Sequence, residues 1–250
     1  SNWKQDIIAE ARTSAEHTDF TLDDQGWVLY TSGIQENGSL CGDDGILVSN
    51  NDTKFQFAPF DQPNALALKS RYEDFTLELA TPSYNKELQF LLISANGSSS
   101  LNVTVNYDDN TKSTTESYSI PDWFGNNSNA ARTGLGRIIT QRSGSQYNAD
   151  QIDINLQFQL FERTIATDIT KKVKSVKFES AKYGSYPTIL AISRFGNKIE
   201  DEAGVDNVTA DSDKTVTGYY NLQGIEVKNP STGIYIVRYS DGTVAKVAIK

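Results

Sequence analysis

The sequence predicts an all-β protein, in which a jelly-roll-like β-sandwich with one short N-terminal helix is followed by a small C-terminal β-rich module. Three observations lead to this prediction. Apolar residues alternate with polar ones along several segments, as they do in strands that bury one face. Clusters of Gly, Asn and Asp separate these segments at short intervals, as turns do. No helical period appears between them, which argues against a parallel α/β sheet.

The helix is expected at the start of the chain. The stretch from Trp3 to Arg12 is free of turn residues, and its apolar side chains, Trp3, Ile7, Ile8 and Ala11, follow helical spacing. We expect this short helix to pack one face against the sandwich.

Strands are expected from Phe20 onward, where the apolar period becomes two. The clearest signal is a hairpin from Leu101 to Ile120 that turns at Asp108–Asn110. Before it, Leu88–Ile93 is a continuous apolar run, typical of a central strand. Further strands are expected at 26–30, 46–48, 54–59, 65–68, 152–160, 173–178 and 188–192.

Composition excludes several classes of function. The 250 residues carry 32 acidic and 23 basic side chains, a formal net charge of −9, and no Lys/Arg cluster gathers on one expected element. Nucleic acid and anionic membranes are therefore poor partners. No run approaches the roughly 20 apolar residues of a membrane helix, so we expect no membrane insertion. Cys41 is the single cysteine, and no disulfide can form within the chain.

The best domain boundary follows residue 197. Residues 198–214 are acidic and poor in large apolar side chains, as linkers are, and residues 215–250 return to a β pattern. Fewer than about 40 residues rarely fold alone, so we expect this module either to pack against another surface or to be partly mobile. Its four short strands are expected around 219–220, 225–227, 234–239 and 244–249.

The end of the chain carries the most specific motif. It consists of residues 219–227, then Pro230, residues 233–239, Asp241-Gly242 and residues 246–250. This order resembles the end of the C-terminal sorting domains used by type IX secretion, which direct passage across the outer membrane. The resemblance implies a bacterial protein that is secreted or held at the outer-membrane surface. The alternative is a β appendage that only packs against its neighbour.

A second set of motifs lies between residues 80 and 195. In order they are residues 88–97, the hairpin, residues 121–124, 134–137, 173–178 and 189–192. This order resembles the galactose-binding-like jelly rolls found beside or within bacterial glycan-degrading proteins. The resemblance implies a polysaccharide or glycan partner, and other cell-surface glycan-utilisation proteins as further partners. It also leaves a structural calcium ion open, and we expect no other cofactor. The carboxylates near enough in sequence to serve are Asp19, Asp23, Asp24, Asp43 and Asp44, although no loop of fixed ligand spacing appears.

Residues that could support catalysis are few. Hydrolysis of a glycosidic bond needs two carboxylates about 5 to 10 Å apart in a cleft. The adjacent pairs Asp23-Asp24, Asp43-Asp44 and Asp108-Asp109 are better explained as turn residues. His17, the single histidine, has no nucleophile motif near it, and Cys41 is better explained as a small buried residue. We therefore expect no enzymatic activity, with glycoside hydrolysis a distant third hypothesis.

The candidate ligand site is the segment from Trp123 to Tyr147. It combines aromatic rings, which stack on sugars, with planar polar side chains, which bond sugar hydroxyls, and long loops in compact domains are often functional. The candidate ligand-binding residues are Trp123, Asn126, Arg132, Arg137 and Tyr147. Two structural alternatives stay open, in which Trp123 caps the core and Gly134–Ile139 forms another strand.

Two hypotheses about function remain from the sequence. The first is an extracellular, non-catalytic carbohydrate-binding accessory protein. The second is a structural or adhesive surface domain that binds no small ligand.

Overall fold

The computed structural model describes residues 3–11, 22–139, 150–196, 215–221, 224–240 and 242–249. The regular elements among these residues are strands throughout, so the described part of the chain contains no helix that could cross a membrane. The chain divides into two compact units, Ser1–Lys198 and Ile199–Lys250. The acidic segment 198–214, expected as a linker, lies outside the described residues.

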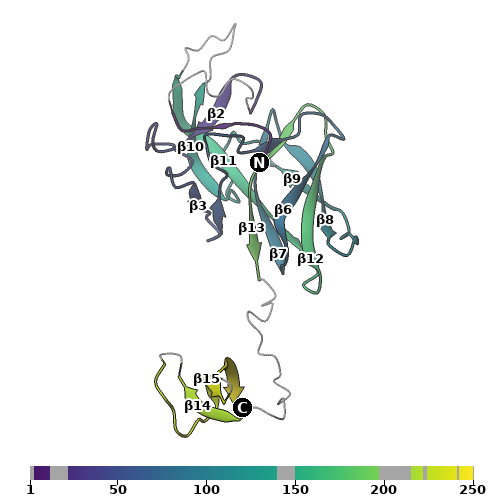
Figure 1. Cartoon of the computed structure of the whole chain (residues 1–250). Helices are drawn as coiled ribbons and strands as arrows, with labels where there is room; N and C mark the ends of the chain where they lie inside the picture. The colour runs from purple at the N-terminus through teal and green to yellow at the C-terminus, as the bar shows by residue number, and fades with distance from the viewer. Residues whose placement is uncertain are drawn as a thin grey trace. The chain divides into compact units, whose positions relative to one another are not determined.

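A seven-stranded sheet forms the centre of the first unit (Figure 1). Its neighbours are antiparallel except β1 and β2, which are parallel. In spatial order its strands are β1 (Ile8–Ala9), β2 (Trp27–Tyr30), β10 (Arg132–Ile139), β11 (Ile152–Ala166), β7 (Glu87–Ala95), β13 (Tyr186–Phe195) and β5 (Leu66–Ala67).

A four-stranded antiparallel sheet packs on one face of the larger sheet and completes a β-sandwich. The two sheets share a core in which Phe90 of the larger sheet meets Phe178 of the smaller one, edge to face, at 5.3 Å between ring centroids. In spatial order the strands of the smaller sheet are β6 (Asp74–Tyr84), β12 (Lys172–Ser180), β8 (Ser99–Tyr107) and β9 (Glu116–Ile120). The expected hairpin is confirmed, since β8 pairs with β9 and Asn110 takes a positive φ in the turn.

A second core lies on the opposite face of the seven-stranded sheet. The hairpin of β3 (Ile46–Val48) and β4 (Lys54–Gln56) contributes Leu47 and Phe55 to this core. Strand β7 supplies Leu88, Phe90 and Leu92 to the first core and Leu91, Ile93 and Ala95 to the second. Burial on both faces explains why this strand is a continuous apolar run rather than an alternating one.

The prediction of a helix from Trp3 to Arg12 is wrong. The described residues of this segment are extended: Ile8 and Ala9 pair with Leu29 and Tyr30, and Gln5 forms a bridge with Ala65. Ile7, Ile8 and Ala9 are all fully buried, which a helix with a single apolar stripe would not permit. Pairing with strands far along the chain satisfies the backbone here and overrides the local helical spacing.

Strand β10 settles one of the open alternatives. Gly134–Ile139 lies within it, so Arg132 and Arg137 project from a strand and not from a loop. Its partner β11 contains a large bulge. Leu135 faces Phe158 and Arg137 faces Asp153, so the four residues 154–157 lie opposite Gly136 alone. Leu156 in this bulge has a φ of 57°. Ile154 and Leu156 are exposed in this bulge.

The second unit contains a three-stranded antiparallel sheet in the order β14 (Val216–Tyr220), β15 (Gly233–Tyr239) and β16 (Val244–Ile249). Three of the four expected strands are present, and the fourth is reduced to a bridge between Tyr220 and Glu226. Val237 is the buried centre of the sheet, beside the edge-to-face rings of Tyr219 and Tyr235.

Candidate functional site

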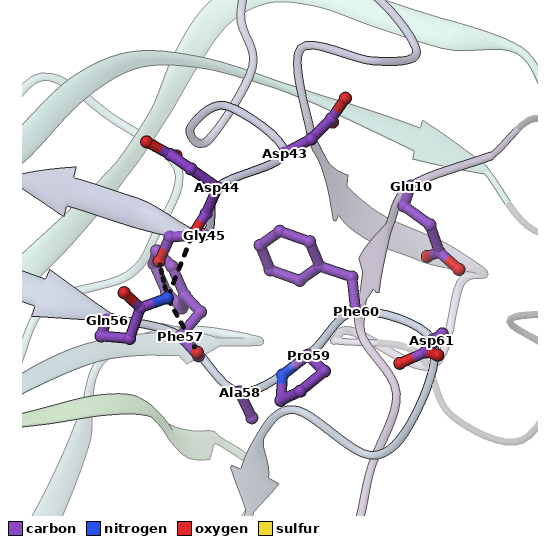
Figure 2. A pocket seen from close by; sticks show the side chains of 10 residues that line it. All are labelled: Glu10, Asp43, Asp44, Gly45, Gln56, Phe57, Ala58, Pro59, Phe60 and Asp61. Atoms are coloured by element: carbon purple, nitrogen blue, oxygen red, sulfur yellow. Dashed lines mark hydrogen bonds between the residues drawn. The ribbon is translucent and has the colours of Figure 1, made fainter.

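A cavity with a volume of about 470 Å³ lies beside the β3–β4 hairpin. Figure 2 shows the ring of Phe60 in the middle of the residues that line it, with Asp43 and Asp44 on one side and Glu10 and Asp61 on another. These residues come from the end of β1, the turn before β3 and the segment after β4. The remaining lining residues are Gly45, Gln56, Phe57, Ala58 and Pro59.

The acidic turn at the cavity is held in place by hydrogen bonds. The Thr31 hydroxyl donates to Asp43 Oδ1 at 3.0 Å, and the Ile46 amide donates to Asp44 Oδ1 at 3.1 Å. The Gln56 side-chain amide donates to the backbone carbonyls of Asp44 and Gly45, both at 3.1 Å (Figure 2). Gly45 has a φ of 67°, a conformation that favours glycine. The carboxylates are therefore oriented before any ligand arrives.

The charged residues that line this cavity are all acidic. Glu10, Asp43, Asp44 and Asp61 carry carboxylates, and none of the described lining residues is basic. Phe57 and Phe60 are buried at its base, and Pro59 adds apolar surface. Carboxylate oxygens accept hydrogen bonds from hydroxyl or ammonium groups, and apolar rings contact C–H groups. The cavity can thus receive a neutral or cationic ligand rich in donors, whereas anions are repelled.

The same negative charges act on Cys41, which is buried in the core beside this turn. Burial is the larger effect, and the charges of Asp44 and Asp43 add to it, raising the pKa of the Cys41 thiol to about 12. Cys41 is therefore a protonated thiol at neutral pH and a poor nucleophile.

We expect Cys41 to resist thiol reagents in the folded protein. At pH 8 the native chain should leave an aromatic disulfide reagent such as 5,5′-dithiobis(2-nitrobenzoate) unreacted, and one equivalent should react once urea unfolds the protein. Because the chain contains one cysteine, the absorbance change reports this thiol alone. Rapid reaction of the native protein would contradict both the burial and the raised pKa.

Arg137 lies at the centre of an aromatic and acidic cluster. Its guanidinium carbon is 4.0 Å from the ring centroid of Trp27 and 4.5 Å from that of Phe158. Its Nε donates to Asp153 Oδ2 at 3.1 Å, and Nη1 lies 3.4 Å from Asp23 Oδ2. With a side chain only 18% exposed, the arginine links β10 to β11 and to the segment before β2. This geometry is that of a structural support.

The structure separates the other residues of the sequence-predicted site. Trp123 is 3% exposed, and its ring packs on Phe158 at 4.5 Å between centroids, which fits the alternative of a core cap. Asn126 and Arg132 are exposed, and Tyr147 lies outside the described residues. Among the described residues of this segment, the aromatic side chain that faces solvent is that of Phe124, 54% exposed, which is not one of the residues predicted from the sequence.

The cavity residues were missed because their sequence signals were local ones. Asp43 and Asp44 were correctly interpreted as turn residues, but nothing in their spacing indicates that Phe60 and Asp61 fold back beside them. A Phe-Ala-Pro-Phe-Asp run at 57–61 after a short strand is the only hint, because a proline there ends the strand and begins a segment outside the sheet.

Two of the carboxylates considered for calcium form ion pairs. Asp23 pairs with Arg137 and Asp24 with Lys69, while Asp19 and His17 lie outside the described residues. Among the residues that the structure describes, no group of three or more His, Cys, Asp or Glu side chains is arranged to hold a metal ion.

Comparison with known proteins gives little. No protein-family model and no curated protein matches the sequence. Among solved structures, the chain is similar to a carbohydrate-binding module of family 28 that is specific for non-crystalline cellulose. The two are 14% identical, and the similarity covers 77% of this chain and 98% of that one at a TM-score of 0.29. A similarity this weak carries no argument about ligand or mechanism.

Proposed function

We propose that the protein is a non-catalytic carbohydrate-binding protein whose cavity beside the β3–β4 hairpin receives a neutral sugar unit of a polysaccharide. The observation that carries the proposal is one cavity that combines the Phe60 ring with four carboxylates. Sugar recognition needs an apolar contact for the C–H face of the ring and fixed acceptors for its hydroxyls, and no perturbed pKa.

Size and preorganisation support this proposal. A volume of about 470 Å³ lies within the range of small-ligand cavities. Asp43 and Asp44 are already held by Thr31 and Ile46, so binding a sugar would not require ordering them.

The acidic lining of the cavity restricts which sugars can bind there. None of the residues that line the cavity is basic, so its carboxylates would repel a uronate or a sulfated sugar, whereas carboxylate oxygens can accept hydrogen bonds from sugar hydroxyls. The charge of the cavity therefore excludes anionic sugars and is compatible with a neutral hexose or pentose unit, for which soluble neutral polysaccharides are the probes.

Asp61→Ala tests the proposed cavity. Asp61 is exposed, so its removal should leave stability unchanged, while the lost acceptor should weaken binding about tenfold. The measurement is retardation in native gels containing xylan, glucomannan, mixed-linkage β-glucan or hydroxyethylcellulose. Asp108→Ala, at an exposed aspartate in the β8–β9 turn, is the matched control and should be retarded as the wild type is.

The alternative function is a structural or adhesive surface domain with no small ligand. Absence of retardation of the wild type on every gel would favour that alternative over carbohydrate binding. Retardation that is lost with Asn126→Ala or Arg132→Ala, but kept with Asp61→Ala, would instead indicate that the polysaccharide binds at the site predicted from the sequence.

The location of the protein is a separate proposal, which rests on the sequence of the C-terminal module. We propose that the protein is bacterial and reaches the cell exterior or the outer-membrane surface through residues 215–250, where other glycan-utilisation proteins would be its partners. Fusing these residues to a periplasmic reporter in a bacterium with type IX secretion tests the proposal. Retention of the reporter in the periplasm would overturn it.

A further inference from the structure

Two tyrosines and an arginine form an exposed cluster at one end of the sandwich. They lie in the loops before β6 and after β12. Tyr72 and Tyr183 are 63% and 70% exposed. The guanidinium carbon of Arg71 lies 4.5 Å from the ring centroid of Tyr72 and 5.1 Å from that of Tyr183. We call Arg71, Tyr72 and Tyr183 the tyrosine platform.

The backbone of Tyr72 is in an unfavourable conformation. Its φ is 67°, in the left-handed region that a bulky aromatic residue rarely adopts. The Glu73 amide donates to the Ser70 carbonyl at 3.0 Å, so Tyr72 occupies the third position of a four-residue turn. Turns with a positive φ at this position favour glycine or asparagine there. Tyrosine is therefore a costly choice at residue 72.

Hydrogen bonds on both sides hold Tyr72 in this conformation. Its amide donates to the Ser180 carbonyl at 2.7 Å, and the Ser180 amide donates back to the Glu73 carbonyl at 2.9 Å. The Glu73 carboxylate accepts from the amides of Lys69 at 2.7 Å and Ser70 at 3.0 Å. These bonds tie the loop that carries Tyr72 to the end of β12, three residues before Tyr183.

Folding gains little from these rings. A side chain that is 63% exposed contributes little hydrophobic stabilisation, while its backbone strain lowers stability. Strain of this kind persists where the residue serves a purpose outside the fold. We propose that the tyrosine platform is a second carbohydrate-binding surface, on which a pyranose ring stacks against tyrosine while Arg71 donates hydrogen bonds to its oxygens. This inference rests on the proposed carbohydrate-binding function.

The chemistry of the platform fits a sugar better than a protein partner. A protein interface needs about 800 Å² per partner with an apolar centre. Here the neighbours of the two rings in the chain are polar or small, Ser70, Glu73, Lys182 and Gly184. These chain neighbours add no large apolar side chain to the two rings, whose size matches one or two sugar units. Arg71 forms no ion pair with a carboxylate of the described residues, so its donors can serve a ligand.

Tyr72→Asn separates binding from folding. Asparagine tolerates a positive φ, so the free energy of unfolding should stay unchanged or rise, while loss of the ring should weaken polysaccharide binding about tenfold. Tyr183→Ala should weaken binding similarly. Both are measured by retardation in the native gels named above and by thermal unfolding. The matched control is Tyr84→Asn, at a half-buried tyrosine of β6 that lies beside Lys172, and it should bind as the wild type does.

The variants distinguish failure of this inference from failure of the cavity proposal. Wild-type binding that is lost with Asp61→Ala but unaffected by Tyr72→Asn and Tyr183→Ala would overturn the platform and leave the cavity. The reverse pattern would support the platform and overturn the cavity. A wild type that no polysaccharide retards would overturn both, and a destabilised Tyr72→Asn variant would show that the ring serves the fold.

Discussion

Replacing Arg137 by alanine is expected to lower the free energy of unfolding of the first unit by about 3 kcal/mol, the cost of breaking a largely buried ion pair. The variant leaves Asp23, only 5% exposed, without its cationic partner. It also removes the guanidinium that covers the rings of Trp27 and Phe158. Chemical unfolding monitored by tryptophan fluorescence would measure the loss.

The free energy of unfolding that is lost on replacing Arg137 by alanine should depend on pH. Burial raises the pKa of Asp23, against the lowering effects of the Gln25 amide and the Arg137 charge. Because the native state holds this proton more tightly than the unfolded chain, stability falls as the pH rises from the ordinary carboxyl pKa through the raised value. Without Arg137 the pKa should rise further, so the loss should be larger at pH 7 than at pH 4.

Two further variants test why Arg137→Ala lowers the stability of the first unit. Arg137→Lys keeps the charge but loses the planar group that bonds Asp153 while stacking on the rings, so it should be intermediate. Arg194→Ala, at an exposed arginine of β13 that donates to Ser83, should change stability by less than about 0.5 kcal/mol. An Arg137→Ala variant as stable as the Arg194→Ala variant would mean that water replaces the contacts of Arg137.

Replacing Gly136 by alanine is expected to destabilise the first unit by about 2 to 3 kcal/mol through overpacking. A Cβ at this position would lie 2.5 Å from the Tyr30 hydroxyl and 2.8 Å from the Asp153 carbonyl oxygen. Tyr30 is fully buried, and its hydroxyl donates to the Asn37 carbonyl at 2.6 Å, so it has no room to move. Gly136 also faces the bulge of β11, where the backbones approach closely.

A double variant tests this explanation. Tyr30→Phe removes the hydroxyl, so Gly136→Ala should cost less in that background than in the wild type, whereas independent sites would add. Thr133→Ala, at an exposed position of the same strand, is the control and should be nearly neutral. Equal losses from Gly136→Ala in both backgrounds would place the clash with the Asp153 carbonyl and not with Tyr30.

The N-terminal segment shows where sequence reasoning failed on the fold. Trp3, Ile7, Ile8 and Ala11 follow helical spacing, yet the described residues form a short parallel pairing with β2. Spacing within one segment cannot reveal that both of its backbone edges will find partners 20 to 60 residues away, as Leu29 and Ala65 do. The hairpin of β8 and β9 succeeded because its alternation and its turn are contained in one stretch of sequence.

The burial of two predicted site residues could not be foreseen for a related reason. Trp123 and Arg137 were selected by residue type, but aromatic and guanidinium groups serve a core support as well as they serve a ligand. Residue type could not tell that Trp123 is buried against Phe158 while Tyr72 and Tyr183 remain in solvent. Exposure decides between these uses, and exposure is a property of the whole fold.

The sequence by itself determined the all-β class, the central strand β7 and three strands of the C-terminal module, because alternation, apolar runs and turn residues are patterns of neighbouring positions. Only the tertiary structure decided which residues meet. It brought Phe60 beside Asp43 and Asp44, placed Arg71 between two exposed tyrosines, and covered Trp123. Pairing and burial between distant strands depend on the free energy of the complete sandwich, which no single segment of the chain encodes.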